Sequence, residues 1–143
     1  MIKNRMLHII VLTVAMAIGA SLGAYAKSIE TSYGFDHFEG TQWRVEKFGD
    51  GPKARGFTFL FEDGHIYVPL LCAPFTATRQ QDGTMLIKPV ETNVMCFAVS
   101  QQEVMISLFF GQLETLVPLD KNTLRLGNSR GDRIIATRIK SQN

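Results

Sequence analysis

The fold of this chain is decided by residues 57–68, which read FTFLFEDGHIYV. Phenylalanine occupies every second position of the first half, so in a β-strand the three rings lie on one face. Asp63-Gly64 follows, and this dipeptide favours the tight type I′ turn of a hairpin. The stretch therefore predicts two antiparallel strands, the second at residues 65–68, with the phenylalanine face buried.

Short stretches on both sides of this hairpin predict further strands, because apolar and polar residues alternate in them between turn-forming residues. The connections, such as Asp82-Gly83, are too short for the crossovers that parallel strands need. Consecutive strands are therefore expected to pair antiparallel. The further strands are predicted at residues 41–48, 75–79, 84–88, 115–119, 123–126 and 132–139.

A helix is predicted to begin at Ser100. Ser100 and Glu103 have the spacing of a capping box, in which each side chain binds the backbone N–H of the other residue. Apolar residues recur at helical spacing after this start, and we expect them to pack on the sheet. They are Val104, Met105, Leu108, Phe109 and Leu113. The predicted fold class is α+β and mostly β: a small antiparallel sheet or partly open barrel with one helix packed across it.

The N-terminal residues predict export. Lys3 and Arg5 precede an apolar run at residues 6–20, and Ala24-Tyr25-Ala26 then matches a signal peptidase site. We interpret residues 1–26 as a cleavable signal peptide; an uncleaved N-terminal anchor is the alternative. The expected location is the periplasm or the secreted space of a bacterium, with no stable membrane span after cleavage.

The remaining chain is near neutral. The precursor has 15 Lys+Arg and 13 Asp+Glu, and loss of Lys3 and Arg5 leaves 13 of each. Nucleic-acid binding requires a basic excess or patch, so no nucleic-acid partner is expected. Residues 27–40 are polar and irregular, and we interpret them as an extended lead-in to one domain, residues 41–143.

Two cysteines, Cys72 and Cys96, lie in the exported part of the chain. An oxidising compartment favours a disulfide between them, which would stabilise the fold by roughly 3 to 4 kcal/mol. A redox pair or a metal site are the alternatives. Their spacing is far from Cys-x-x-Cys, and no histidine lies near either cysteine in sequence.

The pattern of residues from Trp43 to the last strand resembles the META domain, the family that includes the bacterial heat-shock protein HslJ. The resemblance covers nearly all of the exported chain. It is carried by Trp43, Cys72, Phe75, Thr92, Cys96, Glu103, Leu124 and Leu126. The chain departs from the family pattern where Leu71 stands for Gly, Ala73 for Asn, Ala77 for Gly and Arg79 for Tyr. The resemblance implies a small β-rich fold with a helix across it, an envelope or secreted location, and a link to stress or antibiotic tolerance.

No recognisable catalytic pattern is present. His37 and His65 are the histidines left after cleavage, and a metal site needs three or four convergent ligands. We therefore expect no enzyme activity, catalytic residue, metal or cofactor. Five phenylalanines on predicted elements are expected to form either the core or the lining of an apolar ligand cavity. They are Phe57, Phe59, Phe61, Phe75 and Phe109.

Three functions remain open from the sequence. The first is a non-catalytic envelope module, expected to be a monomer, that contacts an envelope protein or an apolar small molecule under stress. The second is a protease inhibitor that presents a loop or the lead-in, residues 27–40, as an arm. The third is an envelope hydrolase, which would require His37 or His65 as its base.

Overall fold

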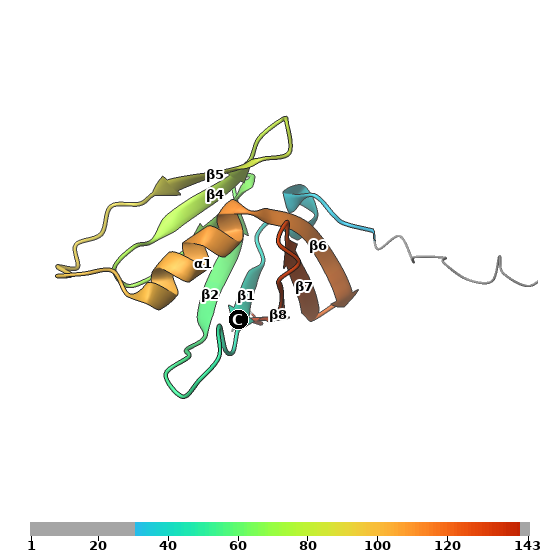
Figure 1. Ribbon diagram of the computed structural model, residues 1–143. Helices are drawn as coiled ribbons and strands as arrows, with labels where there is room; N and C mark the ends of the chain where they lie inside the picture. Colours follow the sequence, from blue (N-terminus) through green and yellow to red (C-terminus); the bar gives the residue numbers. More distant parts are fainter. Residues whose placement is uncertain (1–30, 141–143) are drawn as a thin grey trace, which may run out of the picture. The chain divides into compact units, whose positions relative to one another are not determined.

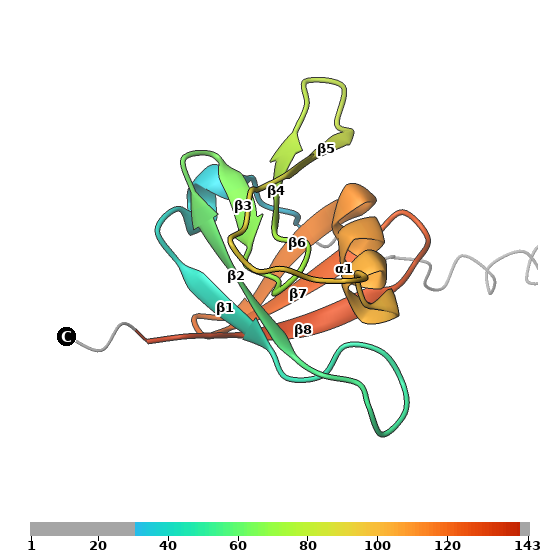
Figure 2. The same cartoon turned by 90° about the vertical axis from the view of Figure 1, so that its left-hand side faces the viewer.

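The computed structural model describes residues 31–140. The predicted signal peptide, residues 1–26, lies outside them. Eight antiparallel strands form one curled sheet, a half-barrel, in the order β5-β4-β3-β2-β1-β8-β7-β6. The α-helix of this part of the chain, α1, connects the two edge strands β5 and β6, and Figures 1 and 2 show it on the open side of the curl. The α+β fold with one helix packed across a curled sheet is confirmed.

The elements follow one another with short connections in most places. Within residues 31–140 the first element is a 3-10 helix, η1, and the last is β8. Their bounds are η1 Phe35–Phe38, β1 Gln42–Val45, β2 Phe57–Glu62, β3 His65–Val68, β4 Phe75–Arg79, β5 Met85–Pro89, α1 Gln101–Gly111, β6 Leu113–Asp120, β7 Thr123–Asn128 and β8 Arg133–Arg138.

The hairpin β2–β3 forms as the sequence predicts. Phe61 pairs with Ile66 and Glu62 with His65, so Asp63 and Gly64 make a two-residue turn. Both turn residues have positive φ angles, 50° and 76°, the conformation that a type I′ turn needs. The β2 phenylalanines are buried and the residues between them are more exposed, as period-2 alternation requires.

Phenylalanine rings form the centre of the core. The five candidate residues, Phe57, Phe59, Phe61, Phe75 and Phe109, are all buried. The ring of Phe110 lies among them, with centroids 5.5 Å from Phe59 and 5.8 Å from Phe75. These distances, with the ring planes inclined at 65° and 62°, are those of close edge-to-face packing. The rings therefore fill the space inside the curl, which supports the core interpretation of these residues.

Helix α1 buries a different face from the one predicted. Ile106, Phe109 and Phe110 point into the core, whereas Val104, Met105 and Leu108 are 46%, 46% and 49% exposed. The prediction was right for Phe109 and wrong for these three residues, because apolar residues lie around most of the helix and spacing alone does not select a face. Leu113, expected on the helix, is buried on β6, since α1 ends at Gly111.

The lead-in differs from the expected extended conformation. Phe35–Phe38 forms one 3-10 turn, and both phenylalanine rings are buried against Phe61, at 5.6 and 5.1 Å. The backbone N–H of Tyr33 donates to the carbonyl of Leu116, and that of Gly40 to the carbonyl of Phe61. Residues 31–40 therefore pack with the domain that was expected to begin at residue 41.

Candidate functional site

The predicted disulfide is present at one end of the curled sheet. Cys72 lies in the connection between β3 and β4, and Cys96 in the connection between β5 and α1. Their Cα atoms are 5.7 Å apart, a normal separation for a disulfide. The bond is consistent with an oxidising, exported location. Residues 90–100, which carry Cys96, are called the disulfide loop below.

Glu103 joins this disulfide to the start of α1. The Glu103 backbone N–H donates to Ser100 Oγ, and Glu103 Oε2 accepts from the Ser100 N–H, so the predicted capping box forms. The second carboxylate oxygen, Oε1, accepts from the backbone N–H of Cys72 at 2.8 Å. Burial opposes ionisation of Glu103, but the hydrogen bonds from Cys72 and Ser100 outweigh it, so its pKa lies below its ordinary value.

The disulfide loop is unusually apolar for its exposure. Every residue from 91 to 100 is exposed. Phe97 and Met95, on either side of Cys96, are 110% and 96% exposed, and Leu71, beside Cys72, is 69% exposed. We define the apolar surface as these three residues together with the other exposed apolar side chains of the loop and of α1. It consists of Leu71, Val94, Met95, Phe97, Val99, Val104, Met105 and Leu108.

Charge is almost absent from this part of the chain. Residues 92–113 read TNVMCFAVSQQEVMISLFFGQL and contain one charged residue, Glu103. Its carboxylate is buried and hydrogen-bonded at the capping box. Solvated helices normally carry charged side chains on their outer face. From Thr92 onward, the disulfide loop and the outer face of α1 present only apolar and uncharged polar groups.

A shallow groove of about 370 Å³ borders the apolar surface beside the first turn of α1. Met105 and Phe48 supply apolar side chains to it, and Lys53 and Asp50 lie at its margin. Gln102 fixes the loop on the other side of the groove, since its side chain binds both the backbone N–H and the carbonyl of Arg55. The groove extends the apolar surface from α1 toward β1.

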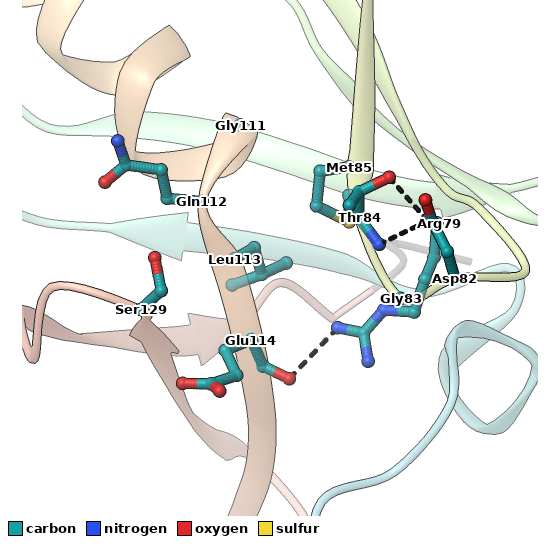
Figure 3. A pocket seen from close by; sticks show the side chains of 10 residues that line it. All are labelled: Arg79, Asp82, Gly83, Thr84, Met85, Gly111, Gln112, Leu113, Glu114 and Ser129. Atoms are coloured by element: carbon teal, nitrogen blue, oxygen red, sulfur yellow. Dashed lines mark hydrogen bonds between the residues drawn. The ribbon is translucent and has the colours of Figure 1, made fainter.

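A second pocket, of about 530 Å³, lies between the β4–β5 turn and the junction of α1 with β6 (Figure 3). Arg79 Nη2 donates to the carbonyl of Glu114 at 3.2 Å, and the guanidinium lies over the Phe35 ring at 5.3 Å. Asp82 accepts from the backbone N–H and the hydroxyl of Thr84. Arg79 thus bridges β4 and β6 across the open side of the sheet.

The groups that line this second pocket are poorly suited to bind a charged ligand. Its one guanidinium is held by the fold, and Arg79 Nε is buried without a partner among residues 31–140. The Asp82 and Glu114 carboxylates share the pocket, so a bound anion would meet negative charge as well as positive. The candidate functional site is therefore the apolar surface.

The two histidines have separate structural surroundings. The His37 ring lies 4.3 Å from Tyr33 and 4.9 Å from Phe38, between centroids. His65 begins β3 and pairs with Glu62. Across residues 31–140, no three His, Cys, Asp or Glu side chains gather in a group that could hold a metal ion. None of the helices in the same range is long and apolar enough to cross a membrane.

Neither a protein-family model nor a curated protein sequence matches the chain. An NMR structure of a protein from Burkholderia xenovorans has a similar fold, with a TM-score of 0.50 and 15% sequence identity. The match covers 76% of this chain and 87% of that chain. At this identity the likeness is one of fold.

Sequence reasoning identified the cysteine pair and Glu103 but missed the apolar surface. It placed Val104, Met105 and Leu108 in the core and did not recognise Met95 and Phe97 as exposed. The signal that could have found them is the charge pattern. The 22 residues from 92 to 113 hold one charge, yet the 11 residues of α1 can bury only one face. An uncharged run this long leaves apolar side chains without a place in the core.

Proposed function

We propose that this protein is a non-catalytic, exported envelope protein of the META type that contacts an apolar partner through the apolar surface, in a role linked to stress or antibiotic tolerance. The signal-like N-terminus and the disulfide support export. The cysteine pair, the helix with an early Glu and the β-rich fold are the features that carry the META resemblance or follow from it. None of these features requires a catalytic group.

One observation carries the proposal: Met95 and Phe97 are almost completely exposed beside a disulfide. Burying a Met or Phe side chain is worth roughly 1.5 to 3 kcal/mol, and this stabilisation is forgone while both remain in water. Large exposed apolar patches on a folded monomer mark interaction sites. The uncharged outer face of α1 continues the same surface, so the patch extends beyond two residues.

The alternatives have less support. An apolar ligand inside the curl would need space that the phenylalanine rings already fill, since Phe110 contacts four other rings there. An inhibitory arm at residues 27–40 would need a free segment, whereas Phe35 and Phe38 are buried in the core. A hydrolase would need His37 or His65 beside a nucleophile or an activated water.

Complementation tests this proposal. In a strain that lacks the chromosomal gene and is sensitive to heat or antibiotic stress, the full-length chain should restore growth. A chain with Met95→Ser and Phe97→Ser should fail to do so. Ile135→Ser is the matched control, because Ile135 is 49% exposed on β8, outside the apolar surface. It should restore growth fully, as should the His37→Ala and His65→Ala variants. Full complementation by the double serine variant would contradict the proposal.

A further inference from the structure

We propose that the partner of the apolar surface is an electrically neutral lipid bilayer, whose interfacial region receives the tip of the disulfide loop. This inference rests on the proposed function and names the chemistry of its partner. Three observations carry it: the projection of the loop, the lack of charge, and the bonds that hold the loop in place.

The disulfide loop projects from the domain. In Figure 1 the segment after β5 runs outward past the end of α1 and then returns into the helix. The exposed fractions of Phe97 and Met95, 110% and 96%, are those of side chains with almost no neighbours. Two such side chains give the projecting loop an exposed apolar surface. A protein partner would need a matching cavity for it, whereas the acyl–headgroup boundary adapts to its shape.

The absence of charge favours lipid over protein. Charged side chains are costly within a bilayer, and residues 92–102 contain none. Glu103, the next residue, is buried and directed to the Cys72 N–H and the Ser100 N–H. Protein interfaces typically surround their apolar centre with a polar rim and are enriched in Arg and Tyr as well as in Phe and Met. No Arg, Lys or Tyr lies between residues 89 and 120.

The near-zero net charge of the exported chain favours a neutral bilayer over an anionic one. Attraction to anionic lipid requires clusters of Lys and Arg at the membrane-facing segment. Within the disulfide loop the one ionisable side chain is the acidic Glu91. Insertion should therefore depend on apolar contact alone and should be insensitive to salt.

The disulfide loop is fixed in place in the free protein. The Cys72–Cys96 bond fixes its middle, and the capping box fixes its end at Ser100. The Cys72 N–H to Glu103 bond fixes the partner segment to the helix. Because these bonds order the loop in the free protein, docking would require little further ordering. The outer face of α1 would then lie along the bilayer surface beside the inserted tip.

The test is flotation of the purified mature chain, residues 27–143, with phosphatidylcholine vesicles. Wild type should float with the vesicles equally at low and high salt. The Met95→Ser, Phe97→Ser double variant should lose at least tenfold in the bound fraction, and Ile135→Ser should bind like wild type. Phe97→Trp should bind and shift its fluorescence to shorter wavelength on vesicle addition, because Trp43 is already buried.

Several results would overturn the inference. They are absence of wild-type flotation, equal flotation of the double variant, and binding that needs anionic lipid and disappears in salt. Lipid-free dimers that the double variant abolishes would also overturn it, since the occupant would then be a second copy of the chain. If flotation fails but the double variant still does not complement, the membrane inference falls and the binding module stands. If the double variant complements, the proposed function itself falls.

Discussion

Glu103 Oε1 accepts a hydrogen bond of 2.8 Å from the backbone N–H of Cys72, a residue 31 positions earlier in the chain. The other carboxylate oxygen closes the capping box at Ser100. One side chain thus ties the disulfide, the β3–β4 connection and the first turn of α1 together. The arrangement holds the apolar surface in a fixed place on the half-barrel.

Loss of the Glu103 side chain should destabilise the fold. Glu103→Ala removes the capping box and leaves the N–H of Cys72 without its acceptor. We expect the free energy of unfolding at pH 7 to fall by roughly 2 to 3 kcal/mol, the range for lost bonds to a charged acceptor. Glu103→Gln keeps an oxygen acceptor and should lose less. Urea unfolding measures both, and equal stability of the alanine variant and wild type would contradict the assignment.

The same carboxylate predicts a pH dependence. Its pKa in the folded protein lies below the ordinary value of 4.5, at which it should titrate when unfolded. Above that pH the full contribution of the Glu103 carboxylate to the stability of the fold is present. As the pH falls below it, the unfolded chain takes up the proton first, so the stabilisation is lost down to the lowered folded pKa.

The measurement is the stability difference between wild type and Glu103→Gln from pH 7 to pH 3. The difference should be constant at pH 6–7 and shrink below about pH 4.5. Taking a difference matters because surface hydrogen bonds lower the pKa values of Asp82 and Asp120 too, and both remain in the variant. A difference that grows on acidification would contradict the role of the Glu103 carboxylate.

Two residues on opposite faces of α1 test which face is buried. Phe110 is fully buried among other rings, so Phe110→Ala should cost roughly 3 to 5 kcal/mol of unfolding free energy. Leu108 is half exposed, and Leu108→Ala should change the stability by about 0.5 kcal/mol or less. Thermal or urea unfolding gives both values. If Leu108→Ala cost more unfolding free energy than Phe110→Ala, the buried face would be the one predicted from helical spacing.

The disulfide should stabilise the fold because it closes a loop of the unfolded chain. Cys72 and Cys96 are 24 residues apart, and cross-linking a loop of that length stabilises a fold by roughly 3 to 4 kcal/mol in the chain-entropy model. The Cys72→Ser, Cys96→Ser double variant should lose about that much. Its stability should not respond to reductant, whereas that of wild type should fall toward the variant. A wild type indifferent to reductant would contradict this contribution.

The local parts of the fold could be predicted from the sequence because local signals determine them. Asp63-Gly64 accounts for the β2–β3 turn, and Ser100 with Glu103 accounts for the start of α1. The curl depends on contacts far apart in sequence, such as the pairing of Trp43 on β1 with Arg138 on β8. No local pattern encodes that pairing, so the sequence alone did not decide between a small sheet and a partly open barrel.

The candidate site was hidden for a related reason. The apolar residues of α1 occur on several sides, and the buried face is set by tertiary contacts: the bond between Glu103 and Cys72 and the packing of the Phe110 ring. That bond directs Glu103 inward, together with Ile106 and Phe110 one and two turns later. Val104, Met105 and Leu108 then face outward. A hydrophobic pattern alone does not contain this information.

Peroxide footprinting of the methionines tests the central claim, that the apolar surface is covered by a partner in the cell. Met95 is 96% exposed and Met105 is 46% exposed, whereas Met85 is less exposed on β5 and serves as the internal reference. In purified protein, Met95 should oxidise faster than Met85. In intact envelopes, Met95 and Met105 should be strongly protected relative to Met85. An unchanged ratio of Met95 to Met85 oxidation between purified protein and envelopes would contradict it.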